Sequence, residues 1–361
     1  MVVALVDRDL REIANDLIKT QTDLREHVQP ASIDLPISDE GYFVRASETP
    51  CRGERVREII DRNLDEGGHN IDLSNGWVLQ RGSVYLVRIG NVVEPLQFEI
   101  MASPKSSIGR VDLGVKLLCD GCEETDKIPV GYTGEVFAEI IANSFDTRIV
   151  AGLPLTQIMV RDSLHIPCER ISLEGLVYSQ SKESLPVKVM GENEFMLSLD
   201  LPNNDKIVGY EAVPTNEILD ITLVGGNDPE EFFRPIYSRN GRLTLQEGRF
   251  YILSTKEGVM IPPHLSAEMI EFTARLREAR AHYAGFFDPG FGYGRNGELR
   301  GTIGVLEVRP YTTSVIKDGQ AICGMRMYKN KDIPQTLYGS AGNNYAKQTG
   351  PKLAKFFKDT A

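Results

Sequence analysis

An internal repeat constrains the fold of this 361-residue chain more than any other feature of its sequence. The segment "LQRGSVYLV", which starts at Leu79, matches "LQEGRFYIL", which starts at Leu245. Further on, "EVFAEII" matches "IGVLEVR" and aligns Glu139 with Glu307, and "AGLPLTQIMV" matches "KDGQAICGMRM". Three matches in the same order and at nearly the same offset predict two copies of one domain.

Each copy has the pattern of a β domain. Leu-Gln-x-Gly makes a turn, and the residues after it alternate between apolar and polar. Most of the chain consists of short, alternating, β-branched segments separated by Gly, Pro and Asn, which favours barrels or sandwiches. The junction lies near "SKESLPVK" at 181–188. We therefore predict a mainly β protein with domains at 1–183 and 184–361.

Helical spacing of apolar residues is scarce. It occurs in Asp7–His27, which predicts one or two helices, and in Arg52–Gly68, which ends in a glycine pair. A third helix is predicted at Ser266–Ala284, where Ser266 is suited to the N-cap position.

The composition is that of a soluble globular protein, with 41% apolar and 25% charged residues. The net charge of -11 argues against a nucleic-acid polymer as partner, because such proteins usually carry an excess of basic residues. No run approaches the ~20 apolar residues of a membrane span, and the N-terminus lacks the pattern of a signal peptide. The odd number of cysteines, five, is typical of free thiols in a reducing cytoplasm.

Cys119 and Cys122 form a CxxC motif. A tetrahedral zinc site needs further ligands, and no second pair or nearby histidine supplies them. Zinc nucleobase deaminases use an H-x-E motif with P-C-x-x-C, but none of the five histidines has Glu two residues later. The motif is therefore interpreted as two thiols at the end of a strand, and a zinc-dependent deaminase is disfavoured.

The segment "SPKSSIGR" gathers two cations and a pair of adjacent serines just before an apolar stretch. Lys105, Ser106, Ser107 and Arg110 carry the groups that phosphate oxygens need. This cluster predicts either a cradle for a polyanion or a polar turn with no further role.

The segment "AGFFDPGFGYG" predicts a tight hairpin. Ala284 and Gly285 would offer backbone groups to a ligand edge, Asp288 opens the turn, and Phe291 would stack on a flat ring or a sugar. The alternative is a plain turn.

Glu139 and Glu307 each lie within an apolar strand. On an inward face such a carboxylate is costly unless it is functional, and its raised pKa would suit acid–base catalysis. On an outward face it would simply be solvated. In the C-terminal tail, Tyr345, Lys347 and Gln348 predict either a flap over a bound anion or a frayed surface helix.

Together these motifs resemble the deoxycytidine triphosphate deaminases of bacteria and archaea, which are relatives of the trimeric dUTPases. The family's Ser-Ser-x-x-Arg segment matches Ser106–Arg110, and its Asp-Pro-Gly-aromatic hairpin matches Asp288–Phe291. Its early Gln-Pro-Ala-Ser-x-Asp-Leu strand resembles "VQPASIDLPIS" at 28–38, and its flap resembles the tail. The first copy departs from the pattern, since its hairpin reads "DKIPVGYTG". In the second copy, "TARLREAR" replaces the Ser-Ser-x-x-Arg segment.

The resemblance implies two tandem dUTPase-like distorted jelly-roll β-barrels with a few short helices. It implies zinc-independent hydrolysis of dCTP to dUTP and ammonia in pyrimidine deoxynucleotide metabolism, with Mg²⁺ bound through the triphosphate. It also implies a cytoplasmic homo-oligomer with sites where domains or subunits meet. One copy would hold phosphate and the other the nucleoside, with Glu307 favoured as the catalyst and Glu139 second. The residues implied to bind substrate are Lys105, Ser106, Ser107, Arg110, Ala284, Gly285, Asp288, Phe291, Tyr345, Lys347 and Gln348.

Three alternatives remain open from the sequence. One is a dUTPase, or a bifunctional enzyme that also cleaves the triphosphate. Another is a non-catalytic nucleotide-binding homologue, and the third is a β-rich structural protein.

Overall fold

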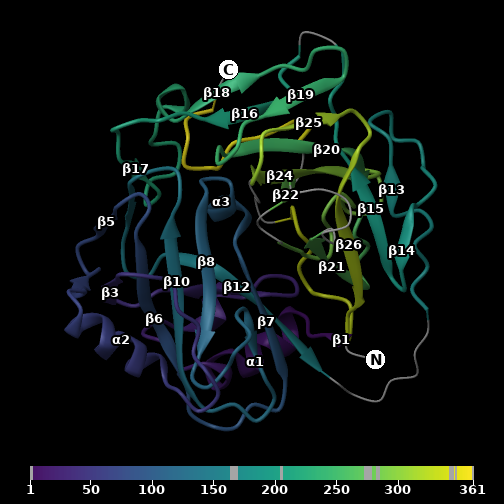
Figure 1. Cartoon of the computed structure of the whole chain (residues 1–361). Helices are drawn as coiled ribbons and strands as arrows, with labels where there is room; N and C mark the ends of the chain where they lie inside the picture. Colours follow the sequence, from purple (N-terminus) through teal and green to yellow (C-terminus); the bar gives the residue numbers. More distant parts are fainter. Residues whose placement is uncertain are drawn as a thin grey trace. The chain divides into compact units, whose positions relative to one another are not determined.

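The computed structural model describes residues 3–162, 170–203, 206–271, 279–281, 285–340, 345 and 348–359. Strands dominate these residues (Figure 1), which confirms the predicted mainly β class. The chain divides into two compact units, which we name by the half of the chain that contributes most to each. The N-terminal unit comprises 2–164, 214–228 and 354–361, and the C-terminal unit comprises 165–213 and 229–353 together with Met1.

The helices of the N-terminal unit are few and short. They are α1 (Asp7–Leu17), η1 (Leu24–His27), α2 (Val56–Asp65) and α3 (Ser106–Gly109). The predictions of helices within 7–27 and 52–68 are confirmed. Among the described residues, no helix has both the length and the apolar character needed to cross a membrane.

The strands of the N-terminal unit form three sheets. Their bounds are β1 (Val3–Ala4), β2 (Ile33–Pro36), β3 (Glu40–Val44), β4 (His69–Asp72), β5 (Trp77–Leu79), β6 (Val84–Val92), β7 (Glu99–Pro104), β8 (Leu113–Cys119), β9 (Lys127–Ile128), β10 (Gly134–Ala142), β11 (Thr147–Ile149), β12 (Pro154–Asp162) and β17 (Leu219–Asp220). One sheet has the order β1-β12-β7-β9, with β2 beside β12; a second has β4-β3-β6-β10-β8, and a third has β17-β11-β5. The interior position of β10 in its sheet, between β6 and β8, matters for the site (Figure 1).

The C-terminal unit also contains three sheets and one short helix, η2 (Pro229–Glu231). Its strands are β13 (Val177–Tyr178), β14 (Val189–Gly191), β15 (Glu194–Ser198), β16 (Gly209–Ala212), β18 (Phe233–Ile236), β19 (Arg242–Leu245), β20 (Tyr251–Val259), β21 (Leu265–Glu271), β22 (Ala279–Ala281), β23 (Phe286–Phe287), β24 (Thr302–Pro310), β25 (Ser314–Lys317) and β26 (Ala321–Lys329). The sheet orders are β18-β16-β20-β24-β22 with β13 beside β20, β14-β15-β26-β21-β23, and β19-β25.

The predicted helix at 266–284 is wrong where the structure describes this segment, and residues 272–278 and 282–284 lie outside the described residues. Leu265–Glu271 forms β21, which pairs with β26 along its whole length, and Ala279–Ala281 forms β22. Leu265, Ala267 and Met269 alternate toward the core of the unit. Pairing with β26 and this burial outweigh the helix propensity of the Ala, Glu and Met residues, because propensity is a weak prior that tertiary contacts override.

The sequence repeat is also a repeat of structure. In the first copy the Gln80 amide donates to the Tyr85 hydroxyl at 3.0 Å, and in the second the Gln246 amide donates to the Tyr251 hydroxyl at 2.9 Å. The pairing of β10 with β6 corresponds to that of β24 with β20. Both copies therefore use the same tyrosine to hold the same turn at the start of an equivalent strand.

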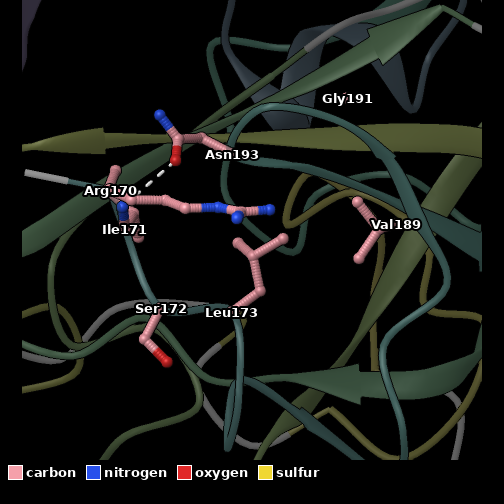
Figure 2. A pocket seen from close by; sticks show the side chains of 7 residues that line it. All are labelled: Arg170, Ile171, Ser172, Leu173, Val189, Gly191 and Asn193. Atoms are coloured by element: carbon pink, nitrogen blue, oxygen red, sulfur yellow. Dashed lines mark hydrogen bonds between the residues drawn. The ribbon is translucent and has the colours of Figure 1, made fainter.

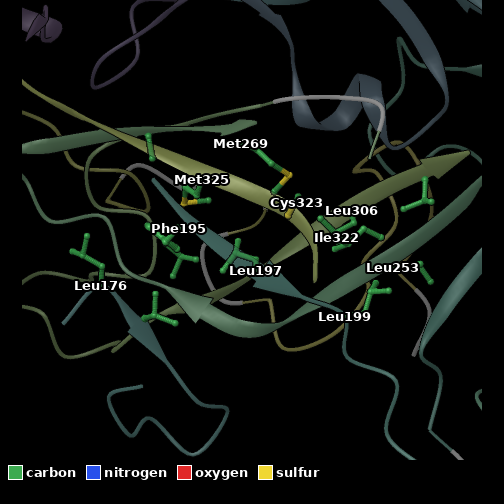
Figure 3. Close-up of a cluster of buried hydrophobic side chains, with 14 of the residues drawn as sticks. Leu176, Phe195, Leu197, Leu199, Leu253, Met269, Leu306, Ile322, Cys323 and Met325 are labelled. Atoms are coloured by element: carbon green, nitrogen blue, oxygen red, sulfur yellow. The ribbon is translucent and has the colours of Figure 1, made fainter. Parts of the chain in front are cut away.

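Each unit has its own hydrophobic core. In the C-terminal unit, side chains from β15, β20, β21, β24 and β26 form a large cluster that includes Phe195, Leu253 and Met325 (Figure 3). In the N-terminal unit, Ile59 and Ile60 of α2 pack with Phe137 of β10. Strand β10 is therefore covered by α2 on the face that also carries Phe137.

Candidate active site

The Ser-Ser-x-x-Arg segment forms a single helical turn in the N-terminal unit. The Ile108 and Gly109 amides donate to the Lys105 carbonyl at 2.8 and 3.1 Å, and the Arg110 amide donates to the Ser106 carbonyl at 3.2 Å. Ser106 is exposed, whereas Ser107 and Arg110 are buried. The turn leads into β8, so it gathers the predicted phosphate-binding residues at the start of a core strand.

Lys105 is held beside Asp34, the aspartate of the "VQPASIDLPIS" segment. Its Nζ forms an ion pair with the Asp34 carboxylate, which is itself buried. Lys355 of the C-terminal tail lies near both groups. Its pKa lies below the ordinary value because its side chain is buried and because Lys105 is close. The tail therefore adds a second lysine beside the predicted cradle, and no sequence motif indicated this position.

Glu139 lies in the middle of β10, opposite Leu86 of β6 and Lys116 of β8. Only 2% of its surface is exposed. The Ser47 hydroxyl donates to its Oε1 at 3.0 Å, so one contact that orients this carboxylate comes from the loop between β3 and α2. Ser47 carries no pattern that points to such a role, and the sequence reasoning missed it.

A second carboxylate lies near Glu139. Asp126 has a φ of 60°, and its Oδ1 accepts a hydrogen bond from the Leu117 amide at 2.8 Å. Burial raises its pKa to about 6, and the nearby Glu139 adds to the rise, while Lys116 opposes it. An acid whose pKa is raised in this way keeps its proton over more of the neutral range than an ordinary aspartic acid. This pair was not anticipated from the sequence.

Glu307 occupies the equivalent place in the C-terminal unit. It lies opposite Ile252 of β20, and 5% of its surface is exposed. Gln348 of the tail donates from Nε2 to the Ile303 carbonyl at 2.6 Å. The structure thus brings the predicted flap residue Gln348 onto β24, the strand that carries Glu307. Residues 348–359 contain no helix, so the alternative of a frayed helix is wrong there.

The predicted nucleoside hairpin lies beside β21. The Gly285 carbonyl accepts from the Met269 amide at 2.9 Å, and the Asp288 carbonyl accepts from the Phe291 amide at 3.2 Å. Phe291 is buried, with its ring centroid 4.9 Å from that of Phe287.

The remaining predicted site residues lie in the core of the C-terminal unit, elsewhere in the tail, or outside the described residues. Phe291 also lies near Tyr338, so its ring belongs to the hydrophobic core of the unit. Tyr345 is buried. Ala284 and Lys347 lie outside the described residues.

A cavity of about 410 Å³ in the C-terminal unit is lined by none of these residues. Figure 2 shows the Arg170 side chain extending between Asn193 and Leu173 toward Val189. The Oδ1 atom of Asn193 accepts a hydrogen bond from the Ile171 amide at 3.2 Å. The cavity therefore lies apart from the predicted carboxylates of the same unit.

The described part of the chain holds no group of three or more His, Cys, Asp or Glu side chains placed to bind a metal ion. A metal bound here would therefore have to take most of its ligands from a bound molecule or from water.

Two family models match the chain. The model of the 2'-deoxycytidine 5'-triphosphate deaminase N-terminal domain matches residues 4–164, and that of the C-terminal domain matches residues 170–357. The chain belongs to this family. The tandem β units of the fold are those of a deaminase with both family domains on one chain.

Solved structures extend the comparison. Among 26 matching chains is the crystal structure of 2'-deoxycytidine 5'-triphosphate deaminase from Agrobacterium tumefaciens. It is 34% identical, with a TM-score of 0.82, and the match covers 94% of this chain and 98% of that one. A search of the curated proteins found no match.

Proposed function

We propose that this protein hydrolyses dCTP to dUTP and ammonia. The observation that carries the proposal is the match of both family domains along nearly the whole chain, together with the structural similarity to the 2'-deoxycytidine 5'-triphosphate deaminase from Agrobacterium tumefaciens. In the cell the reaction would belong to pyrimidine deoxynucleotide metabolism.

Deamination at C4 of cytosine needs an activated water, a proton for the leaving ammonia, and a stabilised tetrahedral intermediate. A glutamate supplies the first two if it takes the two protons of the water in turn, and delivers one to N3 of the ring and the other to the leaving amino group. Glu307 is our first candidate, since it lies on the strand that Gln348 contacts. Glu139 is the second, since it lies in the same unit as the Ser106–Arg110 turn.

The triphosphate would bind at Ser106, Ser107 and Arg110, with Lys105 beside them. Hydroxyls and a guanidinium match phosphate oxygens in charge and geometry. Mg²⁺ would be held through the triphosphate oxygens. When bound, the ion neutralises part of the phosphate charge.

The deamination is proposed to proceed without zinc. Cys119 and Cys122 provide two donors, whereas a catalytic zinc site uses three protein ligands. A third ligand for them is absent from the described residues.

We propose that the protein binds a nucleotide and interacts with neither a nucleic-acid polymer nor a membrane. We further propose that it is a cytoplasmic homo-oligomer and that its units are dUTPase-like barrels. Four of the five cysteines fall in the described residues, and these four are free thiols, which supports a reducing compartment.

The direct experiment follows ammonia and pyrophosphate together in two parallel assays with Mg²⁺, one supplied with dCTP and the other with dUTP. Release of ammonia alone supports the deaminase. Release of both supports a bifunctional enzyme, and release of pyrophosphate from dUTP alone supports a dUTPase. Binding of dCTP without either product would leave a nucleotide-binding homologue and overturn the proposed activity.

Shared sites can be tested by mixing variants. Arg110→Ala removes the phosphate ligand of one copy, and Glu307→Ala removes the favoured carboxylate of the other. If sites combine motifs from different chains, each variant is inactive alone and the mixture regains part of the wild-type rate. Full activity of either variant by itself contradicts this division of labour.

A further inference from the structure

Cys119 and Cys122 lie on opposite ends of one tight turn in the N-terminal unit. Cys119 is the last residue of β8, and the Cys122 amide donates to its carbonyl at 3.2 Å. Gly121, at the third position of the turn, has a φ of 68°, a conformation that glycine adopts without strain. Turns of this kind place the first and fourth Cα atoms within 7 Å, close to the range that a disulfide spans.

The two thiols lie close enough to interact, and they differ in exposure. Cys119 is buried and Cys122 is partly exposed. The Cys119 thiol holds the pKa of Cys122 at about 7, below its ordinary value, whereas burial raises the pKa of Cys119. The groups that face Cys122 are Cys119, Asp120, Glu124 and Lys127. An accessible thiol with a lowered pKa next to a buried partner is the arrangement of a reactive dithiol.

The residues between the two cysteines bind three other segments. Asp120 accepts from the Val56 amide at the start of α2 at 2.8 Å and from the Glu135 amide of β10 at 3.1 Å. The Asp120 amide donates to the Tyr132 hydroxyl at 3.0 Å, and the Gly121 amide donates to the Glu54 carbonyl at 2.7 Å. The turn therefore anchors the first residues of the strand that carries Glu139.

We propose that Cys119 and Cys122 form a redox-active dithiol, which closes to an intrachain disulfide by exchange with a small-molecule disulfide. In the first step the Cys122 thiolate attacks one sulfur of that disulfide, forms a mixed disulfide, and releases one thiolate. In the second step Cys119 loses its proton to solvent and attacks the Cys122 sulfur, which releases the other thiolate. Two cysteine thiols are oxidised and one disulfide is reduced to two thiols, so the electrons balance.

Closure also changes the strand that the turn anchors. The two sulfur atoms must approach to about 2.05 Å to form the disulfide, and this pulls on the Asp120 contacts. The effect on catalysis rests on the proposed function, because it concerns the strand of Glu139. The disulfide itself does not depend on that function.

The test uses the full-length protein, reduced and then incubated with oxidised glutathione. Trypsin cuts after Lys116 and Lys127, so both cysteines fall in the peptide 117–127. After alkylation of free thiols, we expect this peptide to be unalkylated and to be lighter by two hydrogen atoms than its reduced form. A peptide that stays fully alkylated overturns the proposal.

Matched variants identify the pairing. Cys122→Ser should prevent the disulfide, while Cys51→Ser, which removes an exposed thiol, should leave it intact. Loss of the disulfide in Cys51→Ser would mean that Cys51 takes part, and would overturn the assigned pair.

Ammonia release from dCTP tests the coupling. We expect the rate to fall in proportion to the oxidised fraction, to return after reduction, and not to respond to glutathione disulfide in Cys122→Ser. An unchanged rate in fully oxidised protein overturns the coupling to β10. A protein that never releases ammonia overturns the proposed function instead, and the peptide mass still decides whether the disulfide forms.

Discussion

A buried carboxylate in the middle of a strand carries a large free-energy cost unless other groups compensate it. Glu139 and Glu307 both have such a position, at equivalent places in the two copies. For Glu139 the structure gives one compensating contact, from Ser47. Both copies keep a carboxylate at the same position of the strand, although an apolar residue there would make the fold more stable. A catalytic role for the carboxylate explains this most simply.

Replacement of each glutamate by glutamine separates the two candidates. Glutamine keeps the size and most hydrogen bonds but does not take a proton from water. For Glu307→Gln we expect ammonia release to fall by roughly 10²–10⁴-fold, the usual contribution of general acid–base catalysis. Glu139→Gln should have the smaller effect. Exposed Glu247→Gln is the control and should match the wild type.

The assignment of Glu307 fails if Glu139→Gln shows the larger loss, and both assignments fail if neither variant loses activity. Melting curves of all three variants separate a catalytic loss from a loss of folded protein.

Asp126 predicts a pH dependence of stability. Its pKa in the folded protein is raised by burial to about 6, from an ordinary value of 3.8. The folded state then binds more protons than the unfolded state between these values, so stability falls as the pH rises from about 4 to 6 and is constant above. Asp126→Asn removes the titration but keeps an oxygen for the Leu117 amide.

We therefore expect Asp126→Asn to gain stability over the wild type between pH 4 and 7, by at most about 3 kcal/mol. Urea unfolding followed by the fluorescence of Trp77 measures this, because Trp77 is the only tryptophan and lies in the same unit. A constant difference between the two proteins across this range would contradict the raised pKa.

At the scale of elements, periodicity predicted those parts of the fold that local sequence controls. The helices at 7–27 and 52–68 and the repeated strands β6 and β20 were found from spacing alone. The helix prediction for 266–284 was wrong for the residues of β21, because β21 is a strand through its pairing with β26, which is more than fifty positions away. The Ser47 contact with Glu139 was not predicted for the same reason, since it joins a loop to a strand that is distant in the sequence. Sequence patterns carry the period of an element but not the identity of its neighbour.

Helix α2 is tied to β10 by Arg57, and this link can be tested. The guanidinium makes two hydrogen bonds of 2.8 Å to the Glu135 carboxylate and one of 2.7 Å to the Tyr42 hydroxyl. It holds the pKa of Glu135 at about 2, against the opposing effect of burial. Arg57→Met keeps the apolar stem but leaves Glu135 without this partner.

We expect Arg57→Met to cost about 2 kcal/mol of unfolding free energy at pH 7, the range for hydrogen bonds to charged groups. The cost should shrink as the pH falls toward 2, because Glu135 becomes protonated. Arg55→Met is the control, since Arg55 is more exposed and its guanidinium pairs with Glu58 at the surface. Equal effects of the two substitutions, measured by Trp77 fluorescence in urea, would contradict the link.

At the scale of the whole molecule, the chain does not divide at one point. The two-copy organisation could be read from the repeat, because both copies kept the same turn and strand pattern. No sequence pattern indicated that 214–228 and 354–361 pack with the N-terminal unit. In that unit β17 pairs with β11 as a parallel strand, and Asn227 bridges to Phe357. The packing of such distant segments depends on where the preceding loops end in space, and a sequence repeat does not indicate this.

The C-terminal residues should therefore stabilise a unit built mainly from the N-terminal half. The Phe356 carbonyl accepts two hydrogen bonds from Asn227, one from the side-chain Nδ2 at 2.8 Å and one from the backbone amide at 3.0 Å. The Lys358 backbone amide donates to the Asn227 carbonyl at 2.9 Å. Phe357 is 5% exposed. Because loss of a buried phenylalanine leaves a cavity, Phe357→Ala should cost about 3 kcal/mol in the unfolding of this unit.

Trp77 fluorescence in urea reports that loss, because Trp77 lies in the N-terminal unit some 280 positions before Phe357 along the chain. Exposed Lys358→Ala should leave the midpoint unchanged, which separates packing from a general effect of altering the tail. A Phe357→Ala protein whose Trp77 transition is that of the wild type would mean that the C-terminal residues only rest on the N-terminal unit. If the transition moves, the last residues of the chain are part of the unit that carries the predicted phosphate cradle, and removing them should weaken that cradle together with the fold around it.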